Sequence, residues 1–493
     1  MILISTTTEL RQQVQTAIES EYRLSELVTI TDDVSPFADI LVKENIVVAP
    51  VWNNNLPPIL FSSLATTDKT LKGIVYARLG NTEKAKTFFS ANADVVAVLD
   101  LIDSLRNGSP IDAGMITFQS DYAAMHNKAV AIHYGNITAE NSVPNVCNLY
   151  EELLHAETDK TFKAFSAWQF ALLLLDMGRP DYAIEIASSQ IGKGAGEIAD
   201  NFLKSAICSA QLQTLQPPYE GKDFEKLKTN LWECLQFFEK NNYDPEAAET
   251  LSDASHIALV SKSYSEALGY ITKAIEIYTG NELPEMAAQA QLKKGQLLQS
   301  WAQQGNSQFY RSAVQSYQEA LKIFTREDTP EIFADIHHQL GIIYADIPDE
   351  VKKKGIWASV AVSSFNEALS FYNKVDFPYE FAKICNNMGL AYTKFPKALK
   401  SDNFDKALAW YREALDIFTA VDFPAERSAA LLNYVDASWF AGNNEEDNEK
   451  RFEEMNEKAN EILTICTDET ILEQASIHVQ KLSELKVSLN TIS

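Results

Sequence analysis

The chain has 493 residues, a hydrophobic content of 46% and a formal net charge of −26 at pH 7. The hydrophobic content is ordinary for a folded protein. The acidic charge argues against sequence-independent nucleic-acid binding, which needs a basic surface, and it disfavours an anionic membrane surface. A basic partner would instead be drawn to the chain faster.

Glycine and proline are scarce, and strand-like alternation is rare after residue 60, so we expect an almost all-helical chain. No apolar run reaches the roughly 18 residues of a membrane span, and the N-terminus lacks the basic leader of a secretory signal. A scattered, odd set of cysteines without a C-x-x-C pair is typical of reduced core thiols in a cytoplasmic protein. The cysteines are Cys147, Cys208, Cys234, Cys385 and Cys466.

Residues 1–60 depart most from a helical pattern. Ile2-Leu3-Ile4 and Val47 to Trp52 are strand-like. Thr6 with Glu9 forms a candidate capping box for a helix that follows them. We expect this segment to be an N-terminal cap or arm of α/β character.

Residues 61–242 are predicted to form divergent helical repeats. Gly73 and Ala85 mark a first helix pair, and further helices are expected at 117–135, 145–157, 161–177, 181–190, 197–213 and 223–241. Gly192-Lys193-Gly194 lacks the Ser or Thr and the upstream glycines of a phosphate-binding loop. We therefore expect a turn between helices at that point.

The strongest pattern lies in residues 243–440, where five prolyl phrases recur at spacings of 39, 46, 48 and 46 residues. A period in this range predicts stacked helix pairs. Proline suits the first turn of a helix, where its missing N–H costs nothing. The prolines are Pro245, Pro284, Pro330, Pro378 and Pro424.

After each of the last repeated phrases, a first helix carries glycine at a fixed place, and a second helix carries alanine, an aromatic residue and alanine. Steps of four and three residues put these side chains on one helix face. We expect the small residues to let the helices approach closely and the aromatic ring to fill the space beside them. The positions are Gly295 with Ala313, Tyr317 and Ala320; Gly341 with Ala361, Phe365 and Ala368; and Gly389 with Ala407, Tyr411 and Ala414.

This layout resembles the tetratricopeptide repeat (TPR), most clearly over residues 245–440. Its long units and Asp-Phe-Pro linkers are similar to those of long-period bacterial scaffold proteins, some of which carry a CHAT protease domain. The resemblance implies an all-α, right-handed superhelical solenoid of TPR-like helix pairs. Residues 441–493 are then expected to form C-terminal capping helices, because the last apolar face would otherwise meet water.

In a TPR-like solenoid the first helix of each pair lines a concave groove, with inner positions six and three residues before the glycine and one and four after it. The resemblance implies a partner-binding groove that is rich in amides and carries one basic residue. Amides suit an extended peptide backbone because each can donate and accept, and a tryptophan offers an anchor. The groove residues are Gln296, Gln299, His338, Lys383, Asn386, Asp436 and Trp439.

We expect Gln296, His338, Asn386 and Trp439 to be exposed in this groove. A second candidate surface is a basic ridge on the long inserts, which all fall on one edge of the array. It would contact an acidic partner, such as the acidic helix from Glu445 to Glu461 of another copy. The ridge consists of Lys352, Lys353, Lys354, Lys394, Lys397 and Lys400.

Catalytic and metal-binding patterns are missing from the sequence. His337 and His338 are adjacent, so their side chains point about 100° apart on a helix and cannot clamp one metal ion. We predict a non-enzymatic interaction scaffold or adaptor that needs no cofactor and binds a partner protein or peptide in the groove. Two alternatives stay open: a regulatory sensor of a peptide ligand, and a partner subunit of a CHAT-protease-type system on another chain.

Overall fold

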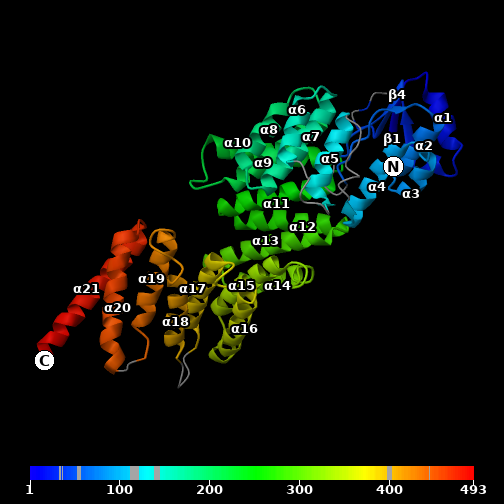
Figure 1. Ribbon diagram of the computed structural model, residues 1–493. Helices are drawn as coiled ribbons and strands as arrows, with labels where there is room; N and C mark the ends of the chain where they lie inside the picture. The colour runs from blue at the N-terminus through cyan, green and yellow to red at the C-terminus, as the bar shows by residue number, and fades with distance from the viewer. Residues whose placement is uncertain are drawn as a thin grey trace. The chain divides into compact units, whose positions relative to one another are not determined.

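The computed structural model describes residues 1–32, 35, 37–52, 57–111, 121–137, 145–396, 402–442 and 445–492. The chain divides into two compact units, an N-terminal unit, Met1–Ser261, and a C-terminal unit, Lys262–Ser493. Figure 1 labels the helices and strands of both units. Among the described residues, no helix is long and apolar enough to cross a membrane.

The N-terminal unit begins with a mixed five-stranded sheet in the order β2-β1-β3-β4-β5. The inner strand β1 pairs in parallel with β2 and β3, whereas β4 pairs antiparallel with both β3 and β5. This sheet confirms the α/β character predicted for the first 60 residues. The strands are β1 Ile2–Thr6, β2 Val28–Thr31, β3 Ile40–Val42, β4 Asn45–Val48 and β5 Leu64–Ala65.

The predicted capping box at Thr6 and Glu9 is wrong. Thr6 is the last residue of β1 and pairs with Val42 of β3. Helix α1, Arg11–Glu19, begins later, and its N-cap residue makes no side-chain hydrogen bond. The backbone N–H of Arg11 instead donates to the Thr7 carbonyl. Pairing within the sheet therefore takes the residue that the capping box would need. A short 3-10 helix, Leu24–Glu26, follows α1.

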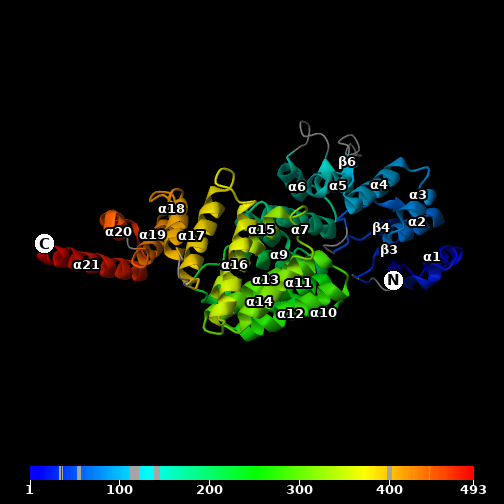
Figure 2. The same cartoon turned by 90° about the horizontal axis from the view of Figure 1, so that it is seen from below.

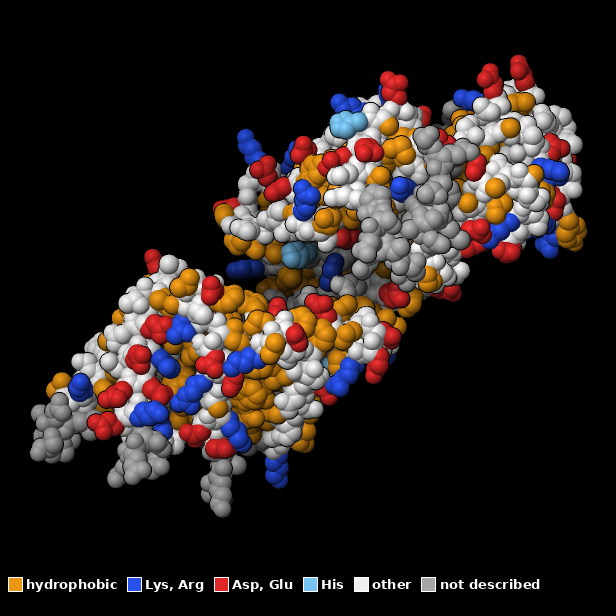
Figure 3. All heavy atoms as spheres, in the orientation of Figure 1, with side chains coloured by type: hydrophobic (Ala, Val, Ile, Leu, Met, Phe, Trp, Pro, Cys, Tyr) orange, Lys and Arg blue, Asp and Glu red, His pale blue; other side chains and the backbone are white. Residues whose placement is uncertain are grey.

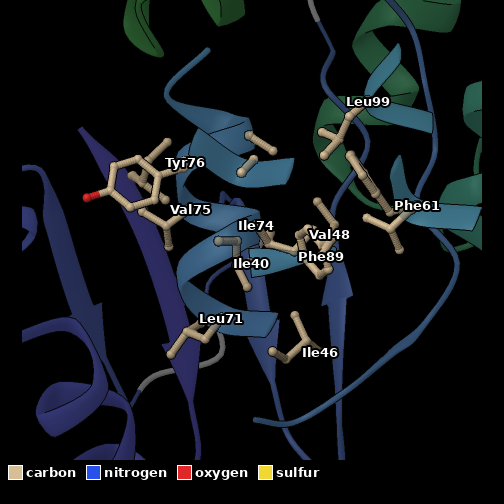
Figure 4. Packing of buried hydrophobic residues seen from close by; sticks show 14 of the residues in the cluster. Ile40, Ile46, Val48, Phe61, Leu71, Ile74, Val75, Tyr76, Phe89 and Leu99 are labelled. Carbon is tan, nitrogen blue, oxygen red and sulfur yellow. The ribbon is translucent and has the colours of Figure 1, made fainter. Parts of the chain in front are cut away.

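The sheet shares one hydrophobic core with the helices that follow it, α2 Asp68–Arg78, α3 Thr82–Phe88 and α4 Ala93–Asn107. In Figure 4, Ile74 of α2 lies next to Ile40 of the sheet. A Cβ atom on Gly73 would lie 2.4 Å from the Phe89 ring, so α2 can only approach the end of α3 this closely with glycine there. The helix pair predicted around Gly73 and Ala85 is confirmed.

The described residues in the rest of the N-terminal unit form helices and their connections, apart from a two-stranded sheet of β6 Pro110–Ile111 and β7 Asn136–Ile137. Trp52, which lies in the chain between β4 and β5, packs its ring 5.0 to 5.5 Å from those of Phe165, Trp168 and Phe202. This contact ties the segment between the two strands to the helices. The helices are α5 Tyr122–Tyr134, α6 Val146–His155, α7 Lys160–Asp176, α8 Pro180–Gln190, α9 Glu197–Gln213, α10 Lys222–Lys240 and α11 Asp244–Val260.

Two smaller predictions for this unit have a clear outcome. Gly192 and Gly194 adopt positive φ angles of 71° and 88° in the turn between α8 and α9, as expected for a connection rather than a phosphate loop. All five cysteines of the chain are free thiols. Four of them are buried and Cys466 is half-buried, which confirms the core positions of the four.

The C-terminal unit is a solenoid of helix pairs. In both Figure 1 and Figure 2, the helices α15, α17, α19 and α21 follow one another along the unit. Proline occupies the first turn of α13, α15, α17 and α19, as predicted. The helices are α12 Tyr264–Gly280, α13 Pro284–Gln303, α14 Phe309–Ala320, α15 Pro330–Asp346, α16 Val351–Leu369, α17 Pro378–Lys394, α18 Asn403–Leu415, α19 Pro424–Ser438, α20 Glu445–Ile465 and α21 Glu469–Ile492.

Within each regular pair, the glycine of the first helix packs against the aromatic ring of the second. A Cβ atom on Gly295 would lie 2.9 Å from Tyr317, one on Gly341 2.8 Å from Phe365, and one on Gly389 2.6 Å from Tyr411. Because these distances are shorter than carbon contacts allow, any side chain there would push the helices apart. The close approach predicted from the sequence is confirmed in all three pairs.

Candidate interaction face of the helical array

The first helices α13, α15, α17 and α19 carry the residues that the sequence assigns to a groove, and we call the surface they form the ladder face. Three of the predicted residues, Gln296, Lys383 and Asp436, are exposed there. Asn386 and Trp439 are half-buried. These five residues are accessible from solvent to different degrees, and their role in binding stays a prediction.

The expected exposure of His338 is wrong, because its side chain is buried with only 5% of its surface accessible. Its ring lies 6.1 Å from that of Phe365, and Asn387 of the next first helix approaches its Nε2 atom at 2.9 Å. Gln299, also predicted for the groove, is similarly buried. Packing between neighbouring repeats encloses both residues.

A series of side-chain hydrogen bonds joins each first helix to the next, and we call it the polar ladder. Gln299 of α13 donates to Gln339 of α15 at 3.1 Å. His338 of α15 contacts Asn387 of α17 as described above. Asn433 of α19 donates to Asn386 of α17 at 3.2 Å. Each contact therefore connects successive repeats through a polar pair.

The last contact of the polar ladder reaches the final helix. The indole N–H of Trp439, the C-cap residue of α19, donates to Nδ1 of His478 in α21 at 3.0 Å. The indole is a donor only, so His478 Nδ1 must accept and the ring proton must reside on Nε2. That Nε2 atom lies 2.9 Å from a carboxylate oxygen of Asp436. The His478 ring thus bridges Trp439 and Asp436 at the end of the ladder.

Burial sets the protonation of the central histidine. Loss of hydration, aided by the nearby charge of Lys383, lowers the pKa of His338 to about 4. The ring is therefore neutral at pH 7, which leaves Nε2 able to accept from the Asn387 amide. The other partner in the first contact, Gln299, also accepts from the Tyr317 hydroxyl at 2.9 Å, so its carbonyl group is satisfied from its own repeat.

Sequence reasoning missed four members of the ladder: Gln339, Asn387, Asn433 and His478. These residues lie outside the inner positions that the TPR resemblance implies. A usable signal existed, because Gln339 and Asn387 each directly follow a predicted groove residue. When two successive residues of a first helix are polar, one side chain can face the groove and the other can contact the next repeat.

The predicted basic ridge is divided by ion pairs. Lys394 pairs with Asp346, and Lys353 lies 3.6 Å from Asp349. Lys352 and Lys354 are exposed in the first turn of α16. Lys397 and Lys400 lie outside the described residues. On the face that Figure 3 shows, Lys and Arg side chains of the C-terminal unit are interspersed with Asp and Glu.

The adjacent histidines diverge as the helix geometry predicts. His337 lies 4.3 Å from the Phe333 ring, whereas His338 faces Phe365. In the described part of the chain, no group of three or more His, Cys, Asp or Glu side chains could hold a metal ion.

Comparison with known proteins supports the repeat assignment. The sequence model of the soluble NSF attachment protein (SNAP) family matches residues 221–377. No curated protein matches the sequence significantly. The structure of a signal transduction ATPase with numerous domains (STAND) from Pyrococcus horikoshii, which has a tetratricopeptide repeat sensor, is similar over 85% of this chain and 68% of that chain, with 15% identity and a TM-score of 0.51.

Two further structures show weaker similarity. The apo form of RapI aligns over 80% of this chain and 96% of its own, with 13% identity and a TM-score of 0.46. The apo form of the quorum sensor NprR from B. thuringiensis aligns over 69% and 93%, with the same identity and TM-score. Identities this low concern the fold alone. Together with the repeated glycine–aromatic pairs, the similarity to the STAND structure shows that the chain has a TPR-type helical repeat fold.

Proposed function

We propose that the chain is a non-enzymatic interaction scaffold that binds an extended segment of a partner protein along the ladder face. The observation that carries this proposal is the polar ladder itself. It holds four successive first helices to one another, so their exposed side chains are presented at fixed positions. A surface ordered in advance loses less conformational entropy when a partner binds.

The residues divide into two roles under this proposal. Gln296, Lys383 and Asp436 are exposed and would contact the partner directly. His338 and Asn386 would act as positioning residues, because their polar groups are engaged with the neighbouring helix. Half-buried Trp439 combines both roles, with its N–H held by His478 and part of its ring accessible.

Two further considerations support a protein partner. The family whose model matches residues 221–377 has a name that states attachment to NSF, and this supports a binding role for the matched segment. Charges of both signs on the ladder face, from Lys383 and Asp436, suit a polypeptide with mixed charge more than nucleic acid. We extend the proposal to a cytoplasmic location on the basis of the free thiols.

The test compares two variants in a pull-down with mass spectrometry, followed by affinity measurement with the recovered partner. The face variant combines Gln296→Ala, Lys383→Glu and Asp436→Lys, all at exposed positions. We expect it to weaken binding about tenfold or more, since reversed charges oppose the same contacts. The ridge variant, with Lys352, Lys353 and Lys354 changed to Glu, should retain every partner that the face variant loses. Retention by the face variant and loss by the ridge variant would refute the proposal.

A further inference from the structure

Two clefts lie between second helices of the C-terminal unit, at corresponding positions of the repeat. In each repeat, the second helix begins its alanine–aromatic–alanine pattern with one alanine, Ala313 in α14 and Ala407 in α18. Residues at the same offsets from that alanine line the two clefts. The α14–α16 cleft takes Arg311, Val314 and Gln318 from α14, and the α18–α20 cleft takes Asp405, Leu408 and Arg412 from α18. The helix packing itself therefore opens a cleft at this register, and the side chains decide what it can hold.

The α14–α16 cleft has an aromatic wall that its counterpart lacks. Trp357 of α16 stacks on Tyr344 of α15, with ring centroids 5.7 Å apart and an interplanar angle of 6°. Val314 and Ile347 extend this apolar wall, and the cleft encloses about 390 Å³. The α18–α20 cleft is about half that size, 200 Å³, and apart from Leu408 its lining is charged.

Asp349 organises the polar side of the α14–α16 cleft. Its side chain, only 8% exposed, accepts from the Trp357 indole N–H at 3.2 Å and from Arg311 at 3.3 Å. It also accepts from the backbone N–H of Glu350 at 2.9 Å, and Lys353 lies 3.6 Å away. These contacts fix the edge of the indole ring and bring two cations to the rim of an apolar wall.

The rim carries more positive than negative charge, in a chain with a formal net charge of −26. Arg311 and Lys353 are 70% and 57% exposed at their side chains. Lys352 and Lys354 are exposed in the same first turn of α16. Cations at this end of a helix oppose its macrodipole and so cost stability. These cations are placed beside the stacked aromatic rings in spite of that cost. Their arrangement therefore suits an acidic ligand.

We propose that the α14–α16 cleft is a docking site for an acidic peptide segment of a partner protein. One aromatic side chain of the segment packs against Trp357, and its flanking carboxylates pair with Arg311 and Lys353, the two cations that line the cleft. Charge complementarity selects the acidic segment, and the stacked Trp357–Tyr344 pair selects an aromatic anchor. This site is distinct from the ladder face and does not depend on binding there.

The test uses short fluorescein-labelled peptides and fluorescence anisotropy with the full chain. The probe peptide has one central phenylalanine flanked by glutamates. One control peptide replaces the phenylalanine with serine, and another replaces the glutamates with glutamines. We expect the probe to bind about tenfold more tightly than either control, and to weaken as salt is raised.

Variants of the chain then locate the binding. The double variant Arg311→Gln with Lys353→Gln and the single variant Trp357→Leu should each weaken the probe about tenfold or more. The matched control, Lys406→Gln with Lys450→Gln, removes two exposed lysines near the α18–α20 cleft and should leave binding unchanged. The double variant changes only exposed side chains. It therefore still tests the proposal if Trp357→Leu does not fold.

Three outcomes would overturn the proposal. Equal binding of the serine control would mean that charge alone attracts the peptide. Equal loss in the matched control would place the effect outside this cleft. Absence of probe binding, combined with self-association in sedimentation that the Lys352, Lys353 and Lys354 to Glu variant abolishes, would identify a second copy of the chain as the occupant.

Discussion

The two units use the same local device in different surroundings. In the N-terminal unit, Gly73 of α2 packs against Phe89, and the pair rests on a five-stranded sheet. In the C-terminal unit, Gly341 packs against Phe365, and the pair rests on further pairs of the same kind. A glycine–aromatic contact therefore specifies how two helices approach, whereas the neighbours decide whether the result is a repeat. The following predictions test that distinction.

The largest expected effect comes from removing the aromatic ring. Phe365→Ala should lower the free energy of unfolding by about 3–5 kcal/mol, because the ring is fully buried and leaves a cavity. In hydrogen exchange, protection should fall in α15, α16 and the adjoining repeats and be retained in the five-stranded sheet. Phe89→Ala should give the converse pattern. Uniform loss of protection over the whole chain in both variants would show that the two units unfold as one.

Next in size is the effect of filling the contact. Gly341→Ala should cost about 1–3 kcal/mol, because the added Cβ would meet Phe365 at 2.8 Å. Gly269 of α12 supplies the matched control, since nothing lies within 4 Å of a Cβ there. Gly269→Ala should stabilise the helix by about 0.5–1 kcal/mol. Urea unfolding followed by circular dichroism measures the free energy of unfolding of both variants. If both alanines destabilise the chain equally, contact with Phe365 is not the cause of the loss.

A buried histidine in each unit makes stability depend on pH. Burial lowers the pKa of both His126 and His338 to about 4 from an ordinary value of 6.5. Because the folded pKa is depressed, the unfolded chain binds protons first as pH falls, so stability is complete above pH 6.5 and declines from there toward pH 4.

Between pH 7 and pH 5, His338 should account for a loss of about 2 kcal/mol in the free energy of unfolding. Urea titrations at the two pH values, with His338→Gln as the comparison, isolate this contribution. His126→Gln should remove a similar dependence from the N-terminal unit, where the ring bonds Ser166 and the Pro58 carbonyl. An unchanged pH dependence in His338→Gln would mean that the ring is hydrated in solution.

The smallest effect separates the polar ladder from the exposed residues beside it. Asn386→Ala should cost about 1 kcal/mol, because the Asn433 amide loses its acceptor. Gln296→Ala, at an exposed position of the same face, should change stability by less than about 0.5 kcal/mol. Chemical unfolding of both variants measures the difference. Equal values would indicate that water replaces the ladder contact without loss.

Much of the fold was predictable because it rests on local residue patterns. The spacing of prolines located the first turns of α13, α15, α17 and α19, and the glycine and aromatic positions located the closest helix contacts. The strand order β2-β1-β3-β4-β5 was not predictable, since it depends on pairing between distant segments with no turn signal that specifies a partner.

The candidate sites were harder to predict, for a physical reason. Position in a helix indicates which way a side chain points, but not whether the next repeat covers it, and His338 is covered. The α14–α16 cleft combines Arg311, Tyr344 and Trp357 from three helices, with Asp349 from a loop. No single-helix pattern brings those residues together. The four-part division at residues 60, 242 and 440 stays a prediction.

The polar ladder also gives the C-terminal unit an unequal response to mechanical load. Its contacts are hydrogen bonds of 2.9 to 3.2 Å that join the first helices to one another and the end of α19 to α21. Such bonds weaken within a few tenths of an ångström of stretching, whereas apolar side chains can slide past one another. Bending that spreads the first helices apart should therefore meet stiff, stepwise resistance, and bending in the opposite sense should meet less. If binding of a partner to the ladder face required the first helices to spread apart, these hydrogen bonds would oppose that movement.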